Sequence, residues 1–182
     1  EIFEQPQTIQ QALHNRFIEE FGTVEFENFS FTPQQLQSVK RILILACGTS
    51  WHAGCIAASL LEDKARIPTQ AEIASEFRYK NPIVSEDTLV IAISQSGETA
   101  DTLAALRRAK VDFNAKTIGV CNVQGSSIAR ECAGLVMTHA GPEIGVASTK
   151  AFMGQLVALL LLAIRVGRAR GALPETEARR VA

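Results

Sequence analysis

The sequence has no surplus of positive charge. Its 18 Lys and Arg residues stand against 19 Asp and Glu, a formal net charge of −1 at pH 7. A chain with this balance lacks the basic surface that neutralises nucleic acid or an acidic membrane. We therefore expect neither nucleic acid nor a membrane among its partners.

Long hydrophobic runs and targeting signals are also missing. The most apolar segment, residues 156–164, is shorter than the roughly 20 residues that cross a bilayer, so we predict a buried helix there. The chain does not open with a charged segment followed by an apolar stretch, as a secretory signal does. It begins at Glu1 without Met and ends in a charged, helix-like run over 176–182, from which we expect a fragment of a longer protein.

Cysteine and histidine are few and scattered. The four cysteines form no C-x-x-C pair, and the three histidines are far apart in the sequence, so no metal site is expected. We expect reduced, buried thiols in a cytoplasmic protein, although Cys47 adjoins a candidate site and could be partly reactive. The residues concerned are Cys47, Cys55, Cys121, Cys132, His14, His52 and His139.

What the chain does have is enough apolar sequence for one substantial core. It contains 182 residues, of which 47% are hydrophobic and 20% charged, and this fits a single domain. Apolar residues over 1–21 recur at the spacing of an amphipathic helix, and Thr32 followed by Pro33 marks the start of a short helix over 33–39. We predict a helical lead-in over 1–39 and a compact domain over 40–182.

Within the compact domain, short apolar strands alternate with helices. Apolar strands separated by helices are typical of a doubly wound parallel sheet, the three-layer αβα form of the α/β class. No internal repeat or low-complexity segment interrupts the pattern. The predicted strands are 41–46, 69–73, 88–93, 116–121 and 134–138, and the predicted helices are 50–64, 75–79, 99–110, 127–131 and 149–168.

Three loops are candidates for a binding site because each follows a predicted strand. In open parallel sheets, ligands bind beyond the carboxyl ends of the strands, where the strand order reverses. An order of 2-1-3-4-5 would place the first and third strands on either side of that point. The loops selected are 47–50, 94–99 and 141–150.

The loop 94–99 is the most informative of the three. Ser94, Ser96 and Thr99 offer hydroxyls, Gln95 offers an amide, and Gly97 permits a tight turn before a helix. Backbone N–H groups and hydroxyls at the positive end of a helix dipole can hold a phosphate. No Lys or Arg is present in this loop or in 47–50, so moderate affinity and easy release are expected.

Two further observations limit the class of ligand that the loop 94–99 can bind. The patterns GxxxxGK[ST] and GxGxxG are missing from the sequence, which argues against nucleotide binding by those modes. Glu98 and Asp101 would repel an anion, and we expect them to point to solvent.

The other two loops carry weaker signals. Gly48 permits close approach of a ligand, while Thr49 and Ser50 could bind it or simply cap the next helix. In 141–150, Glu143 and Ser148 are candidates to line the cleft, but the loop could equally be a plain connection with Ser148 or Thr149 as the helix cap. We expect Lys150 to turn away, since a lysine is unfavourable at a helix start.

Several segments together resemble a known family. They match the first sugar-isomerase (SIS) subdomain of the glutamine:fructose-6-phosphate amidotransferases, or glucosamine-6-phosphate synthases. The S-x-S-G-x-T turn is shared broadly among SIS proteins, whereas the blocks 76–79 and 143–150 are more specific to these synthases. The matching segments are 1–6, 45–50, 72–79, 94–102, 121–123, 125–127 and 143–152.

The resemblance implies a five-stranded parallel sheet of SIS (flavodoxin-like) type that binds a sugar phosphate. The ligand implied is fructose 6-phosphate or glucosamine 6-phosphate, and no metal or organic cofactor is implied. By the resemblance, its phosphate is bound by Thr49, Ser50, Ser94, Gln95, Ser96 and Thr99, and its sugar is lined by Val146 and Ser148.

Parts of the family enzyme have no counterpart in this sequence. Enzymes of this family take ammonia from glutamine in a glutaminase domain, and a second SIS subdomain supplies the acid and base groups for isomerisation. We therefore assign no catalytic residue and expect a chain that binds but does not turn over. SIS halves pair with one another, and the apolar helix over 152–164 could need a partner's surface, so a homodimer is expected.

Two other functions stay open at this point. The chain could belong to a non-enzymatic SIS regulator that senses sugar phosphates, because such proteins share the phosphate turn. It could also be a stand-alone phosphosugar isomerase with His52 or His139 as the base. Flanking sequence would distinguish the first alternative, and turnover by the isolated chain would establish the second.

Overall fold

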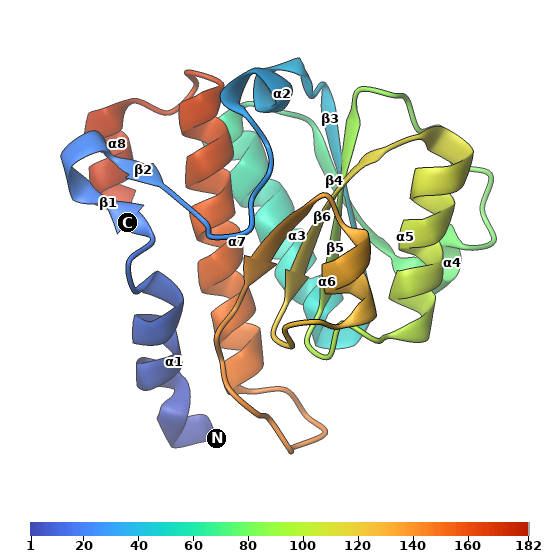
Figure 1. Cartoon of the computed structure of the whole chain (residues 1–182), viewed down its shortest axis with the longest axis horizontal. Helices are drawn as coiled ribbons and strands as arrows, with labels where there is room; N and C mark the ends of the chain where they lie inside the picture. Colours follow the sequence, from blue (N-terminus) through green and yellow to red (C-terminus); the bar gives the residue numbers. More distant parts are fainter. Residues whose placement is uncertain (182) are drawn as a thin grey trace.

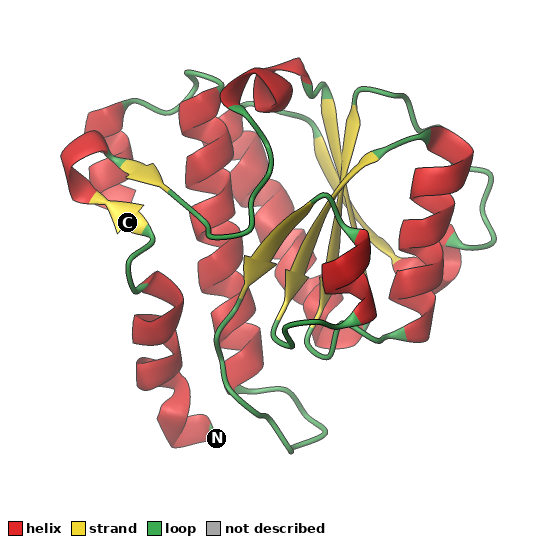
Figure 2. Ribbon diagram, in the orientation of Figure 1, coloured by secondary structure: helices red, strands yellow, loops and turns green. Residues whose placement is uncertain are grey.

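A five-stranded parallel sheet forms the centre of the protein (Figures 1 and 2). The structure, a computed structural model, describes residues 1–181. The strand order is β4-β3-β5-β6-β7, which is the predicted 2-1-3-4-5. The strands are β3 (Arg41–Ala46), β4 (Thr69–Ile73), β5 (Thr88–Ser94), β6 (Lys116–Cys121) and β7 (Gly134–Met137), so all five predicted strands are confirmed.

Helices cover both faces of the sheet, which confirms the three-layer αβα prediction. Successive side chains of a strand point to opposite faces, and in β3 Ile42 and Ile44 join one core cluster while Leu43 and Leu45 join the other. The first face is covered by α3 (Gly48–Ala65) and α7 (Lys150–Ala169). The second is covered by α4 (Ala74–Phe77), α5 (Ala100–Phe113) and α6 (Ser127–Glu131) (Figure 1).

The N-terminal segment differs from its prediction. A short 3-10 turn, η1 (Ile2–Glu4), leads into α1 (Gln5–Leu13), which ends well before residue 21. Asn15 then adopts a left-handed conformation at φ 55°, which a helix cannot continue through. The chain forms a small antiparallel hairpin of β1 (Phe17–Ile18) and β2 (Thr23–Val24), joined by η2 (Glu19–Phe21). The single helix predicted over 1–21 is therefore wrong.

The remainder of the lead-in contains the predicted short helix. In α2 (Pro33–Ser38), the Thr32 hydroxyl accepts from the Gln35 backbone, and the Gln35 side chain accepts from the Thr32 backbone. This reciprocal capping box satisfies two backbone donors at the helix start. At the other end of the chain, α8 (Glu175–Val181) forms the charged run predicted over 176–182, of which Ala182 lies outside the described residues.

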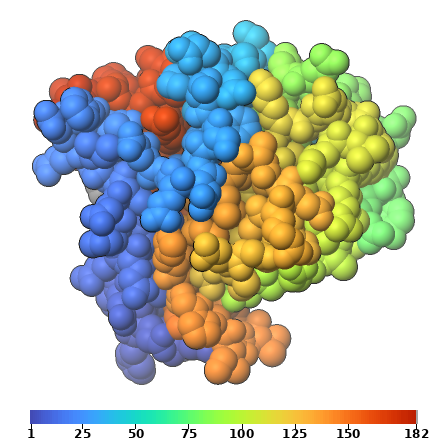
Figure 3. Space-filling view, viewed as in Figure 1, coloured from blue at the N-terminus to red at the C-terminus, as the bar shows by residue number. Residues whose placement is uncertain are grey.

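The long helix α7 is a core helix. It has 20 residues, which confirms the helix predicted over 149–168, and by length and composition alone it could cross a membrane. Because 67% of its most apolar window is buried inside the protein, the prediction of a buried helix is also confirmed. It packs against α1 and α3, and in the space-filling view the N-terminal segment, in blue, lies along it (Figure 3). Among the described residues, the large apolar side chains that are exposed lie elsewhere, so this helix does not support the predicted dimer, which stays a prediction.

Candidate functional site

Two candidate loops leave the same edge of the sheet, at the point where the strand order reverses. β3 and β5 are parallel neighbours, with Ala46 opposite Ile93 at their carboxyl ends. From these ends the chain enters α3 on one face of the sheet and α5 on the other. This is the switch-point geometry at which doubly wound sheets bind ligands.

Hydrogen bonds between its own groups shape the turn after β5. The Ser94 hydroxyl, which is buried, accepts from the Gly97 backbone N–H at 3.0 Å and lies 2.9 Å from the Thr99 hydroxyl. The Ser96 hydroxyl accepts from the Glu98 backbone N–H at 3.1 Å. The first N–H groups of any helix lack intrahelical acceptors. Thr99 is the N-cap of α5, and its side chain accepts from none of these groups. The turn therefore presents donors beyond the end of β5.

Of the two acidic residues near this turn, Glu98 is exposed, as predicted, and Asp101 is partly exposed, but both also bind groups of neighbouring segments. The Glu98 carboxylate accepts from the Ser127 backbone N–H at 2.6 Å, and this hydrogen bond lowers the pKa of Glu98. Asp101 forms an ion pair with Arg78 at 2.5 Å. Both negative charges are thus engaged with donors of neighbouring segments.

The loop after β3 is shorter than predicted because α3 starts earlier. The helix begins at Gly48, whose φ is 57°, and Cys47 occupies the N-cap position. Thr49 and Ser50 therefore lie in the first turn and do not cap the helix, which corrects their predicted capping role. Thr49 is exposed, whereas Ser50 is buried and its hydroxyl accepts from the Gln155 amide at 3.0 Å.

Glu143 organises the third loop. Its carboxylate accepts from the backbone N–H groups of Thr149 at 2.8 Å and Ala151 at 3.1 Å, and from the Ser148 hydroxyl at 3.0 Å. Thr149 is at the N-cap position but makes no cap bond with its side chain, so the carboxylate caps α7 in place of the predicted hydroxyls. Val146 is fully exposed.

A comparison of the sequence with known protein families shows which family the chain belongs to. The SIS domain family matches residues 35–165, which is more than half of the chain. The chain belongs to the SIS family. The resemblance carried by the sequence motifs is thereby confirmed at the level of the domain.

Individual relatives of this SIS chain are aminotransferases. It is 54% identical over 170 residues to the glutamine–fructose-6-phosphate aminotransferase [isomerizing] of Chlorobaculum tepidum, covering 93% of this chain and 28% of that protein. A relative of the same name from Thermus thermophilus is 50% identical over 178 residues, covering 98% of this chain and 29% of that protein. The SIS chain therefore spans less than a third of the length of these relatives.

A solved structure is similar over nearly the whole chain. It is the C-terminal domain of the glucosamine-fructose-6-phosphate aminotransferase from Francisella tularensis, with a TM-score of 0.90 and 39% sequence identity. The match covers 98% of this chain and 49% of that one. The fold of this SIS chain thus corresponds to about half of that domain.

The N-terminal residues of the SIS chain hold the third loop in place, which sequence reasoning missed. The Glu1 carboxylate accepts from the backbone N–H groups of Ile144 at 2.7 Å and Gly145 at 3.2 Å. Lys150 is only 5% exposed, and its ammonium pairs with Glu4 at 2.5 Å. The prediction that Lys150 turns away to solvent is therefore wrong. No local pattern indicates these contacts, because the partners are more than 140 residues apart in sequence.

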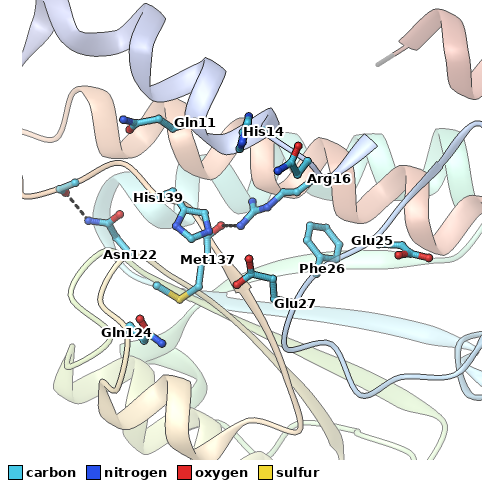
Figure 4. Close-up of a pocket in the computed structure, with 12 residues that line it drawn as sticks. Gln11, His14, Arg16, Glu25, Phe26, Glu27, Asn122, Gln124, Met137 and His139 are labelled. Carbon is cyan, nitrogen blue, oxygen red and sulfur yellow. Dashed lines mark hydrogen bonds between the residues drawn. The ribbon is translucent and has the colours of Figure 1, made fainter. Parts of the chain in front are cut away.

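A cavity of about 750 Å³ lies between the lead-in and the end of β7, and its lining does not include residues of the turn over 94–99 (Figure 4). His139 lines it at φ 53°, and burial, together with nearby Arg16, lowers the pKa of this imidazole. His52 is exposed on α3, with its ring centroid 4.9 Å from that of Trp51. The two histidines considered as isomerase bases therefore lie in different surroundings. Among residues 1–181, no group of three or more His, Cys, Asp or Glu could hold a metal ion.

Proposed function

We propose that this SIS chain binds the phosphate group of fructose 6-phosphate and of glucosamine 6-phosphate. The observation that carries the proposal is the hydrogen-bonded turn over 94–99, which faces the start of α3 across the switch point. Its donors are backbone N–H groups and hydroxyls at the positive end of α5, and these favour a dianionic phosphate. The similarity to the aminotransferases supports a ketose phosphate as the ligand.

The proposed contacts divide between the phosphate and the sugar. Ser96, Thr99, Gln95 and Thr49 contact the phosphate directly, together with Ser50. Ser94 contributes mainly through Thr99, because its hydroxyl already bonds within the turn. Val146 and Ser148 line the sugar from the third loop, in which Glu143 holds Ser148.

The chain then forms the first half of the isomerase domain of a larger cytoplasmic enzyme. In our proposal that enzyme converts L-glutamine and fructose 6-phosphate into L-glutamate and glucosamine 6-phosphate. A glutaminase domain supplies the ammonia, and a second SIS subdomain supplies the groups that move protons. The enzyme is a homodimer, and this chain alone binds the sugar phosphate without turnover.

Isothermal titration calorimetry tests the proposal. We expect fructose 6-phosphate and glucosamine 6-phosphate to bind the chain and free fructose not to bind. The double variant Ser96→Ala, Thr99→Ala should lose about 5- to 150-fold in affinity, since each hydroxyl contributes roughly 0.5–1.5 kcal/mol. Ser59→Ala, an exposed hydroxyl farther along α3, is the matched control and should bind normally. No binding by a folded sample, or unchanged affinity of the double variant, would exclude the proposal.

A further inference from the structure

Gln155 is a buried amide in an otherwise apolar stretch of α7. It is only 2% exposed, and its Nε2 donates to the Ser50 hydroxyl at 3.0 Å. Its Oε1 has no hydrogen-bond partner among the described residues. A half-satisfied buried amide is unfavourable compared with an apolar side chain. Packing therefore does not account for a glutamine at this position.

The hydrogen bond from Gln155 leaves the hydrogen of the Ser50 hydroxyl free to donate. A serine hydroxyl has one hydrogen to donate and two lone pairs that accept. The Gln155 amide occupies a lone pair, and within residues 1–181 no group accepts the Ser50 hydrogen. Ser50 lies in the first turn of α3, at the edge of the sheet where the phosphate turn begins. Its hydrogen is therefore available to an acceptor at that edge.

Close helix packing keeps the two residues together. Near the other end of α7, Gly167 lies against the backbone of α3, where a Cβ atom would be 2.5 Å from the Lys64 carbonyl oxygen. A Cβ atom at Gly54 of α3 would be 2.9 Å from the Ile44 side chain of β3. These contacts leave α3 no room to shift between the sheet and α7. The core, and not a loop, thus holds Gln155 against Ser50.

We propose that Gln155 is a positioning residue of the phosphate site, which orients the Ser50 hydroxyl so that its hydrogen points to a phosphate oxygen. This inference rests on the proposed function and extends it to a residue outside the three loops. A donor oriented before binding loses less freedom when the ligand arrives. The effect depends on the amide donating, because an acceptor at this position would take the Ser50 hydrogen away from the phosphate.

The test is a double-mutant cycle in calorimetric titrations with inorganic phosphate and with fructose 6-phosphate. Gln155→Met, unbranched and similar in length, should weaken both ligands about 5- to 10-fold, the effect of one hydrogen bond. In a Ser50→Ala background the same substitution should cause no further loss, because the residue acts through Ser50. Leu162→Met, a buried volume-conserving change on the same helix, is the control and should leave both affinities unchanged.

A second variant tests the direction of the hydrogen bond. Gln155→Glu replaces the donor with an acceptor and adds negative charge, so it should weaken both ligands more than Gln155→Met does. The inference is overturned if folded Gln155→Met or Gln155→Glu binds like the wild type, or if the losses from Gln155→Met and Ser50→Ala simply add. Failure of the wild-type chain to bind fructose 6-phosphate would instead refute the proposed function.

Discussion

The conformation of the turn over 94–99 depends on Gly97, and Gly97→Ala tests this directly. Gly97 adopts φ 68°, and a Cβ atom there would lie 2.0 Å from the Ser126 hydroxyl oxygen and 2.5 Å from the Ser126 Cβ. Gly125, in the neighbouring loop, has φ 77° but no atom within 4 Å of its Cβ position. The two substitutions therefore share the backbone strain and differ in the steric clash.

The expected loss in free energy of unfolding follows from the backbone strain and the steric clash. A left-handed conformation costs about 1–2 kcal/mol for a residue with a Cβ, so Gly125→Ala should lower the free energy of unfolding by about that amount. The clash in Gly97→Ala adds about 1–3 kcal/mol, for a total of roughly 2–5 kcal/mol. Because the Gly97 N–H bonds to Ser94, Gly97→Ala should also weaken fructose 6-phosphate binding, and Gly125→Ala should not.

Equilibrium urea unfolding measures the free energy of unfolding of Gly97→Ala and Gly125→Ala relative to the wild type. The comparison holds when the fitted m-values are the same for all variants. Ser126→Gly removes the clashing side chain, for whose hydroxyl the described residues provide no hydrogen-bond partner. In a Ser126→Gly background, Gly97→Ala should lower the free energy of unfolding less than it does in the wild type. The difference between the two losses is the contribution of the clash. Equal losses for Gly97→Ala and Gly125→Ala, or no recovery with Ser126→Gly, would refute this account of the turn.

Three further predictions concern the surroundings of the site. Arg108 donates to three carbonyl oxygens around the end of α4, so Arg108→Met should destabilise the chain by roughly 1–3 kcal/mol in urea unfolding; an unchanged midpoint would contradict this. Burial raises the pKa of Cys121 and of Cys132 to about 12, so the folded state keeps protons that the unfolded state loses above about pH 9, and the free energy of unfolding should fall from there toward pH 12; a double Cys→Ala variant that retains the same slope would exclude the thiols as its cause. The lowered pKa of Glu98 means that its contact with Ser127 persists somewhat below the usual carboxyl range and is lost as the pH falls through that lowered value. The protection factor of the Ser127 amide in hydrogen exchange should therefore fall at low pH in the wild type and should be low already at neutral pH in Glu98→Gln; wild-type protection in Glu98→Gln at neutral pH would contradict this.

The sheet could be predicted because each strand carries its own local signal. Strands such as 88–93 are short apolar runs bounded by polar or turn-forming residues, and burial on both faces makes the run nearly continuous. The hairpin at 17–24 has strands of two residues, too short to show an alternating pattern. Phe17 also continues the helical spacing of the residues before it, so the helix was predicted too long.

The placement of the loops of the candidate site could be predicted for the same reason, whereas the contacts that support these loops could not. The carboxyl ends of parallel strands share one edge, so placing 47–50 and 94–99 on neighbouring strands brought them together. The Glu4–Lys150 pair and the capping of α7 by Glu143 depend on where loops fold in space. Gln155 did carry a signal, as a lone amide inside an apolar helix. The roles of the individual ligand-binding residues stay predictions.

The position of α7 has a consequence for how the chain folds during synthesis. The helix covers one face of the sheet together with α3, and it is completed only at Ala169. The first core strand ends at Ala46, so about 120 residues emerge in between, which takes roughly 6–25 s at ordinary rates of translation. Until α7 is complete, Ile44, and Ile91 once it has been synthesised, lack their final cover. A nascent chain stopped before α7 should therefore be a target for chaperones, and release from them should coincide with the emergence of this helix.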